Sequence, residues 1–487
     1  MIAKRIIFFL LMGPAFWFLS CTSPKNPGEP YANQPPDTRM ANVPPNDVTG
    51  KNSYFPLVTL YWIGSDPDGY VVKYRYRWKS YFSNGDSLVH DWIDTVATKV
   101  SIVFESADTL NPHLFEVKAV DNEGADDPTP ARVRFFTKQA LPPNTQIKTG
   151  PTPGDTVFCS EKITDTWQGI VFTYSGSDPD GEVIDFSWKV DNGLWRRWSY
   201  QTKAVVLSHD LQAPLSGGHT FYVKSRDDTY VEDPTPDSTK FTVIVPTWDK
   251  SILVVDETRD GTGAAGSPSD EQVDGFYARL IEGNHRIFTP WDFAKQGFPA
   301  ISELGRHRVV LWHKDHYLVS ASQVVTQANM KVLQDYLNVG GKLWLVGWDF
   351  LPHLYSDPAN LPTGTTFDQT FGYNYIHIGN AKRTGKLDFI GAKGRLDYGD
   401  LEIDPTKLQA TWGGKINKVY SLEPRGFAET LFLFNSSTQD PEFQDKPCGV
   451  RYIGTTYRVL FFGFPLYFMK EDQALIVAGK ALVDLME

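Results

Sequence analysis

The sequence predicts a multidomain chain in which two all-β sandwiches are followed by an α/β domain with three layers. Three observations carry this prediction. A set of landmarks occurs twice, in the same order, in the first half of the 487 residues. The segments between these landmarks alternate β-branched or aromatic residues with polar ones, as half-buried strands do. After Pro246 the pattern changes to apolar runs that alternate with segments of helical spacing, which indicates a parallel sheet with helices.

Composition and charge describe a folded, acidic protein. The chain is 41% hydrophobic and 14% aromatic, and its formal net charge is −11. Because binding to phosphates requires a basic surface, this charge excludes nucleic acid as a partner. The three cysteines lie far apart in the sequence, so neither a disulfide framework nor a cysteine metal site is predicted.

The N-terminus is expected to be an export segment. Lys4 and Arg5 precede an apolar stretch, residues 6–19, which is too short to predict a membrane span. The stretch ends in Phe18-Leu19-Ser20-Cys21, which resembles the lipobox of bacterial lipoproteins. This resemblance implies that residues 1–20 are a lipoprotein signal peptide and that Cys21 is lipidated. An ordinary signal peptide with an incidental cysteine is the alternative.

Residues 21–34 are rich in Pro, Asn, Ser and Gly, which predicts a flexible tether after the anchor. Thr22, rather than an aspartate, follows the cysteine. By resemblance to the sorting rule of some Gram-negative bacteria, this position implies the outer membrane. The expected location is therefore the cell envelope, on either its periplasmic or its surface face.

The duplication is defined by three landmarks. Ser-Asp-Pro-Asp-Gly occurs at 65–69 and at 177–181. A Pro-Pro-x-Thr segment precedes each copy and an Asp-Pro-Thr-Pro segment follows it, and each landmark returns roughly 110 residues later, as in a tandem repeat. We therefore expect one domain over 35–140 and a second over 141–247.

Both repeats are predicted to be built of short antiparallel strands joined by turns. The strands are expected at 58–63, 71–78, 99–104, 114–120 and 132–137 in the first repeat, and at 170–174, 182–190, 204–207, 219–225 and 240–245 in the second. This pattern resembles the immunoglobulin-like or fibronectin type III-like modules of bacterial surface proteins. The resemblance implies spacers or binding platforms.

In such sandwiches the Ser-Asp-Pro-Asp-Gly turn and the later acidic loop lie at the same end of the fold. Carboxylates that converge there would suit Ca²⁺. The alternative is that each aspartate caps its own turn through backbone hydrogen bonds, since the spacing does not match a complete calcium loop. The candidate calcium ligands are Asp66, Asp68, Asp121 and Asp126 in the first repeat and Asp178, Asp180, Asp227 and Asp233 in the second.

The last domain, residues 248–487, is predicted to alternate strands and helices. Strands are expected at 251–256, 308–312, 342–347 and 458–464, and helices at 273–281, 325–337 and 472–486. Ser320 or Ser322 is the expected cap of the second helix. Residues 365–450 are expected to elaborate this core with strands at 373–378, 431–435 and 449–453.

The runs 252–256 and 336–349 resemble those of the class I glutamine amidotransferase-like fold, which belongs to the flavodoxin-like α/β architectures. Active members place a nucleophilic cysteine in the turn after the third of these strands and bring a histidine from a late loop. Here the turn is Gly347-Trp348-Asp349-Phe350, and the late segment 463–467 has neither His nor Glu. The resemblance thus implies a domain without amidotransferase chemistry. Cys448 is expected to be a buried, inert thiol.

A different chemistry is considered in the same cleft, because ligands bind at the carboxyl ends of strands in open α/β sheets. Asp256, His313, His316 and Asp349 are the candidates for holding a metal or a sugar. The alternative is a polar loop that only bonds backbone and helix ends. Lys314, between the two histidines, counts against a metal because it adds repulsion.

Three functions follow from these features. The first is a non-catalytic envelope lipoprotein, anchored to the membrane by its lipid, whose sandwiches present the last domain to an envelope protein or polysaccharide. The second is a surface hydrolase that acts on a glycan or peptide in the α/β cleft, where Trp291, Trp312, Trp344 and Trp348 would stack on sugars unless they belong to the core. The third is an adhesion module stiffened by Ca²⁺.

Overall fold

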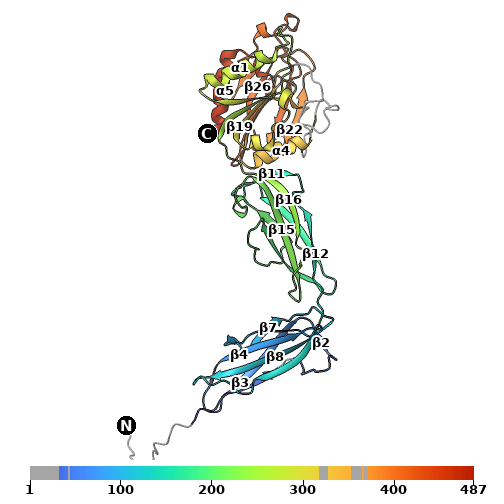
Figure 1. The fold of residues 1–487 in the computed structure, drawn as a ribbon. Coiled ribbons are helices and arrows are strands. Elements are labelled where there is room, and N and C mark those ends of the chain that lie inside the picture. Colours follow the sequence, from blue (N-terminus) through green and yellow to red (C-terminus); the bar gives the residue numbers. More distant parts are fainter. Residues whose placement is uncertain (1–31, 42–43, 317–326, 352–364, 367–369) are drawn as a thin grey trace, which may run out of the picture. The chain divides into compact units, whose positions relative to one another are not determined.

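The computed structural model describes residues 32–41, 44–316, 327–351, 365–366 and 370–487. The chain forms two compact units, and the boundary between them falls between Ala140 and Leu141 (Figure 1). The predicted signal peptide, Cys21 and most of the predicted tether lie outside the described residues. Within the described part, no helix has the length and apolar character needed to cross a bilayer.

The first unit is a sandwich of two antiparallel sheets, together with one short parallel pair. One sheet has the order β1-β3-β7, and the other has the order β2-β9-β8-β4-β5 with β6 paired to β4. Its core lies between the sheets and is rich in aromatic side chains, among them Trp62, Phe104, Phe115 and Phe135. The strands are β1 (Asp37–Ala41), β2 (Ser53–Tyr54), β3 (Leu57–Ser65), β4 (Val71–Tyr81), β5 (Ser87–Val89), β6 (Ile93–Thr95), β7 (Lys99–Val103), β8 (Leu110–Asp121) and β9 (Ala131–Lys138).

The second unit begins with a sandwich of the same design. Its sheets have the orders β10-β12-β14 and β11-β16-β15-β13. Where the first repeat carries β5 and β6 between β4 and β7, the second repeat has a shorter connection between β13 and β14 that contains no strand. The strands are β10 (Asn144–Thr149), β11 (Thr156–Phe158), β12 (Ile170–Ser177), β13 (Val183–Val190), β14 (Lys203–Val206), β15 (Gly217–Asp227) and β16 (Asp237–Ile244).

The β-sandwich prediction is thus confirmed for both repeats, and the ten predicted strands correspond to β3, β4, β7, β8, β9, β12, β13, β14, β15 and β16. The strands β1 and β10, which directly follow the Pro-Pro pairs, were not predicted. They are short and polar, and their pairing with β3 and β12 holds them in place.

The rest of the second unit is built on a nine-stranded sheet with the order β18-β17-β19-β20-β28-β27-β26-β23-β24. The first five strands of this order pair in parallel and the rest are antiparallel. The five parallel strands are β17 (Lys250–Asp256), β18 (Phe288–Asp292), β19 (His307–Lys314), β20 (Lys342–Gly347) and β28 (Arg458–Phe462), and the antiparallel ones are β23 (Phe389–Gly394), β24 (Leu401–Glu402), β26 (Glu429–Ser436) and β27 (Pro447–Ile453).

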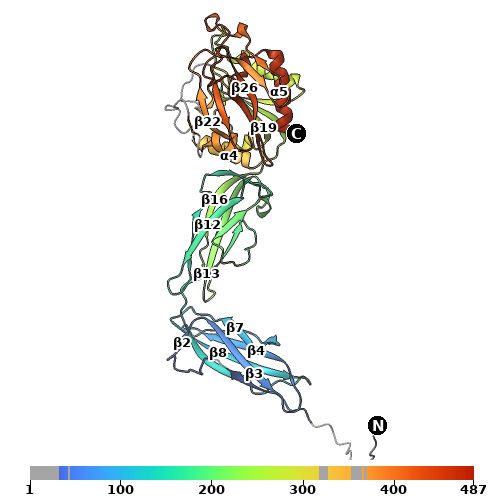
Figure 2. The ribbon, with the colours of Figure 1, turned by 180° about the vertical axis from the view of Figure 1, so that it is seen from behind.

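Both faces of the parallel strands are covered, because alternate residues belong to different cores. Leu253 and Val310 pack with α4 (Gln327–Asn338), whereas Ile252 and Val309 pack with α1 (Asp270–Gly283) and α5 (Glu471–Met486). The helices α1 and α5 contact each other on their face of the sheet (Figures 1 and 2). Continuous apolar runs such as 252–255 are typical of strands buried on both faces.

Three predictions for this region need correction or completion. The predicted strand at 373–378 is wrong: residues Gly372–Ile376 form a π-helical turn, and the strand β22 (Ile378–Arg383) begins only after it. The strand β18 was not predicted, because Pro290 stands at its centre; Pro is tolerated here at the edge of the sheet. The predicted caps Ser320 and Ser322 lie outside the described residues.

The second sandwich packs directly on this sheet's helices, and β11 contacts both α4 and the short helix α3 (Ile301–Leu304) (Figure 1). A Cβ on Gly305 would lie 3.0 Å from Ile244 and 3.2 Å from Phe158, so the backbone approaches closely there. The hydroxyl of Thr455 donates to Asp165 at 2.9 Å, and Thr456 bonds the same carboxylate. A single hydrophobic core therefore runs from this sandwich into the sheet domain.

Candidate functional site

Two sequence-predicted residues meet at the carboxyl ends of neighbouring strands. Asp256 ends β17, His313 lies near the end of β19, and the parallel register places them opposite each other. The His313 Nδ1 lies 3.3 Å from Asp256 Oδ1. The chain leaves β17 toward β18 on one side and later returns to β19 on the other, and ligands of open α/β sheets bind where the strand order reverses in this way.

The His313 ring is fully buried and held from several directions. It stacks on the Tyr277 ring of α1, with 3.8 Å between the ring centroids. Its Nδ1 lies 3.5 Å from Asp315 Oδ2, and Tyr277 donates its hydroxyl to the same Asp315 oxygen at 2.9 Å. The second ring nitrogen, Nε2, has no hydrogen-bond partner although it is buried. Burial disfavours the imidazolium, but the nearby carboxylates of Asp256 and Asp315 outweigh it and raise the pKa of His313.

Asp256 is a buried carboxyl that is only half satisfied. Its Oδ1 accepts the Thr258 N–H at 2.7 Å, whereas its Oδ2 is buried with no partner. Loss of hydration raises the pKa of Asp256 to about 8, against the attraction of His313, and the nearby Asp270 carboxyl adds to the rise.

A cavity of about 590 Å³ opens beside Asp256, between α1 and β18. Its wall is strongly acidic: Asp270, Glu271, Asp274 and Asp292 line it together with Asp256. Lys295, a basic residue of the wall, forms an ion pair with Asp292. Because acidic residues outnumber the basic Lys295 among the charged residues of this wall, its charge favours a cation.

A second charged pair lies on the opposite side of the same strand ends. The Glu257 carboxylate accepts the Trp312 indole N–H at 2.9 Å, and burial raises the pKa of Glu257 to about 7. Burial likewise lowers the pKa of Lys314 to about 8, although the charge of Glu257 opposes this shift. Successive residues of a strand point to opposite faces, so Lys314 turns away from the His313 side.

The other two predicted site residues do not complete the cluster. Asp349 accepts the Tyr420 hydroxyl at 2.7 Å and lies 3.3 Å from the Arg383 guanidinium, so its carboxylate is committed to these two groups. His316 accepts the Arg259 N–H at 3.3 Å through Nδ1. The structure thus joins Asp256 and His313, and the residues that complete their surroundings, Asp274 and Tyr277, were missed because they come from a helix.

Three of the four candidate tryptophans are core residues, whereas Trp291 lines the acidic cavity. Trp312, Trp344 and Trp348 are fully buried, and half-buried Trp291 donates its N–H to the Gly297 carbonyl at 2.8 Å. Cys448 is buried as predicted, and burial raises its thiol pKa well above the usual range. Burial also raises the pKa of Cys159 to about 12.

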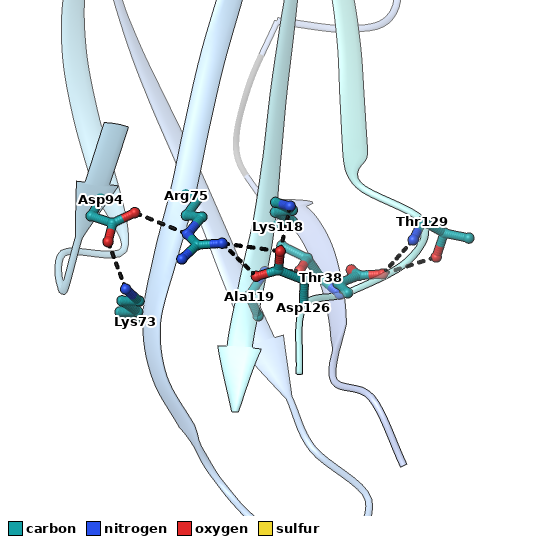
Figure 3. Close-up of polar contacts among 9 residues, drawn as sticks. Thr38, Lys73, Arg75, Asp94, Lys118, Ala119, Asp126 and Thr129 are labelled. Atoms are coloured by element: carbon teal, nitrogen blue, oxygen red, sulfur yellow. Dashed lines mark hydrogen bonds and ion pairs between the residues drawn. The ribbon is translucent and has the colours of Figure 1, made fainter. Parts of the chain in front are cut away.

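In the first repeat, the candidate calcium ligands are engaged mainly with the protein. Asp126 lies between Arg75 and Lys118, both at hydrogen-bond distance (Figure 3). Asp121 accepts the N–H groups of its own loop, at residues 123 and 125, and the Asn33 amide. Asp66 accepts the Asp68 N–H at 3.4 Å, the turn-capping contact given above as the alternative.

In the second repeat, Asp178 and Asp227 come together with Asp228, and one oxygen of each lies within 4.8 Å of the others. Asp180 adjoins this group, since its N–H donates to Asp178 at 3.1 Å, but its own carboxylate faces the Leu141 N–H. Asp233 is engaged elsewhere and accepts the Thr145 N–H at 2.8 Å. A calcium site at the eight residues therefore stays a prediction, and its geometry is best in the second repeat.

No protein-family model and no curated protein matches the chain. Among solved structures, it is similar to the fibronectin(III)-like modules of Clostridium thermocellum CbhA, with 16% identity and a TM-score of 0.23 over 43% of this chain and 95% of that one. It is similar to the chicken CNTN1 FN1-FN3 domains, with 13% identity and a TM-score of 0.22 over 43% of this chain and 69% of that one. A bacterial ice-binding adhesin matches with 14% identity and a TM-score of 0.15 over 45% of this chain and 72% of that one. The assignment of both repeats as β-sandwiches rests on the pairing of their strands.

Proposed function

We propose that this chain is a non-catalytic lipoprotein of the cell envelope, anchored to the outer membrane through Cys21. In this proposal the two sandwiches are spacers, and they present a three-layer α/β domain similar to the class I glutamine amidotransferases. That domain binds an envelope protein or a polysaccharide instead of turning over a substrate.

The order of the parallel strands supports the likeness to that fold. Starting from β17, the chain places β18 on one side and then β19, β20 and β28 successively on the other, which is the order of flavodoxin-like sheets. The turn after β20 is then where the active amidotransferases carry their nucleophile.

The observation that carries the proposal is the state of this turn. Asp349 occupies it with φ +51, in the left-handed region that glycine favours and that Asp enters more readily than most other residues. Its carboxylate is tied to Tyr420 and Arg383, and its neighbours Trp348 and Phe350 are buried. A nucleophile needs an adjacent base and access to a substrate. Here the reactive position holds a buried, hydrogen-bonded aspartate.

The hydrolase alternative is favoured by one observation, the contact between Asp256 and His313. A carboxylate–imidazole pair at strand ends is a usual part of a general acid–base site. However, Asp349 is committed to other partners, so the four residues expected for this activity do not form one group.

Phase partition in a detergent that separates membrane-anchored from water-soluble proteins tests the anchor. The full chain, expressed in a Gram-negative host, is expected in the detergent phase, and Cys21→Ser in the aqueous phase. Equal partition of the two would contradict lipidation at Cys21.

The same preparations test the lack of catalysis. The full chain should release no ammonia from glutamine above a boiled control, and Asp349→Asn should not differ from it. Ammonia release that depends on Asp349 would overturn the non-catalytic proposal while leaving the anchor unaffected.

A further inference from the structure

We propose that Asp256, His313 and Asp274 bind one divalent transition-metal cation at the acidic cavity between α1 and β18. One ligand atom from each of the three residues lies within 4.8 Å of the others. Two of the residues come from neighbouring parallel strands and the third from the helix that covers them. This inference is independent of the proposed anchor and of the partner.

Two buried atoms without partners point to a ligand here. His313 is 0% exposed and its Nε2 has no hydrogen bond, while Asp256 is 4% exposed and its Oδ2 has none. Buried polar side-chain atoms nearly always have a partner, because an unsatisfied one bears the full cost of its lost hydration. Asp256 is both unsatisfied and part of the cavity wall, so a cation in the cavity is within its reach.

The third proposed ligand, Asp274, is accessible to solvent. Asp274 lies on α1 and is exposed, and it lines the same cavity as Asp256. Asp270 and Glu271 add further negative charge to the wall, whereas the positive charge of Lys295 is paired with Asp292. An acidic recess with low-dielectric walls concentrates cations.

The donor set selects the class of cation. One imidazole nitrogen with two carboxylates suits Zn²⁺ and other divalent transition metals such as Fe²⁺, whereas Ca²⁺ and Mg²⁺ prefer oxygen ligands alone. The surroundings also resemble those of metal-bound histidines, whose rings are oriented by a second partner. Here His313 Nδ1 lies 3.3 Å from Asp256 and 3.5 Å from Asp315, which is itself held by Tyr277, and Nε2 is the ring nitrogen without a partner.

Lys314 does not count against a cation at this site, because its ammonium lies near Asp349 and Glu257. Its ammonium lies 3.5 Å from the Asp349 carbonyl oxygen and interacts with Glu257. Both groups belong to the other side of the strand ends.

Isothermal titration of the metal-free full chain with Zn²⁺ tests the site. We expect one saturable site per chain, and a loss of affinity of at least roughly tenfold in Asp274→Asn, since removing even an outer partner of a ligand costs this much. Glu271→Gln is the matched control: it removes one charge from the same wall but no ligand, and it should keep the affinity within about threefold, because only screened electrostatics change.

Asp274 and Glu271 are both exposed, so neither substitution should disturb the core, and circular dichroism checks that both variants fold. Zn²⁺ should also raise the unfolding temperature of the wild type and of Glu271→Gln, but not that of Asp274→Asn, because a ligand that binds only the folded state stabilises it. Equal affinity in wild type and Asp274→Asn would overturn the site. Equal losses in the two variants would also overturn it, since they would show attraction by charge without ligation.

Discussion

The two sandwiches differ in their surroundings far more than in their design. Phe115 and Phe221 occupy the same Phe-x-Val-Lys position of the repeats and both are fully buried. Phe115 belongs to a core made of first-sandwich residues, whereas Phe221 belongs to a core that continues into the sheet domain. The first sandwich therefore has a core of its own, whereas the second sandwich shares its core with the last domain.

A buried histidine at one repeat position shows a second divergence. In the first repeat, His113 is bonded to the hydroxyls of Ser80 and Thr137, each at 2.9 Å. In the second, the equivalent His219 lies 2.7 Å from the Asp191 carboxylate. The fold tolerates either neutral or charged partners at this position, so the duplicated position has been adapted separately in each copy.

A third position has not diverged. Asp127 accepts the Thr38 N–H at 2.8 Å, and Asp233 accepts the Thr145 N–H at 2.8 Å. Each aspartate thus joins the Asp-Pro-Thr-Pro landmark to the Pro-Pro-x-Thr landmark about 90 residues away. The two landmarks return together because they form one contact.

The largest expected effect concerns the cores. Phe115→Ala and Phe221→Ala should each cost about 3–5 kcal/mol of unfolding free energy, through lost burial and the cavity left behind. Because the core of Phe221 is shared, its loss should also speed hydrogen exchange in β19 and β20, whereas Phe115→Ala should not. Hydrogen-exchange mass spectrometry of the full chain measures this, and unchanged exchange in β19 and β20 of Phe221→Ala would show that the sandwich and the sheet unfold independently.

The second effect is the pH dependence that His113 gives to the first repeat. Burial lowers the pKa of His113 to about 4, although the Glu105 charge opposes this. The unfolded chain therefore takes up a proton below about pH 6.5 that the folded sandwich refuses, so stability present above pH 6.5 is lost as the pH falls toward 4. The loss approaches about 3 kcal/mol at pH 4.

Urea unfolding of the first unit at pH 7 and pH 5 measures this loss. His113→Asn should flatten the difference between the two pH values, whatever its effect at pH 7. His219→Asn serves as the matched control, because it should leave the pH dependence of the first unit as it is. A wild-type midpoint equal at both pH values would contradict the assignment to His113.

The smallest effect concerns the landmark contact. Asp127→Ala and Asp233→Ala should each destabilise their own sandwich by about 2 kcal/mol, since each leaves a buried backbone N–H without its charged acceptor. Asp126→Ala, next to the first of them, removes only partly exposed ion pairs and should cost less than about 1 kcal/mol. Chemical denaturation compares the three. Equal losses in Asp126→Ala and Asp127→Ala would mean that general charge, not the contact, stabilises the strand.

The sequence predicted the sandwiches well because their strands carry the period-two pattern and their turns carry Gly, Pro and Asp. The sequence did not predict the strands that are held by pairing with a neighbouring strand and that lack a hydrophobic pattern of their own. The short polar strands β1 and β10 have no periodicity of their own, and β18 contains a proline at the sheet edge. The π-helical turn at 372–376 has the aromatic composition of a strand, which misled the prediction at 373–378.

For the site, the sequence determined which polar residues follow the strands, and therefore that Asp256 and His313 stand at one sheet edge. Only the tertiary structure decided that they touch, that Asp274 and Tyr277 of α1 join them, and that Asp349 is bound instead to Tyr420 and Arg383. The physical reason is the distance along the sequence between the residues that decide each feature. A strand pattern is set by neighbours in sequence, whereas burial, unsatisfied atoms and shared cores depend on residues that meet only when the sheet is assembled.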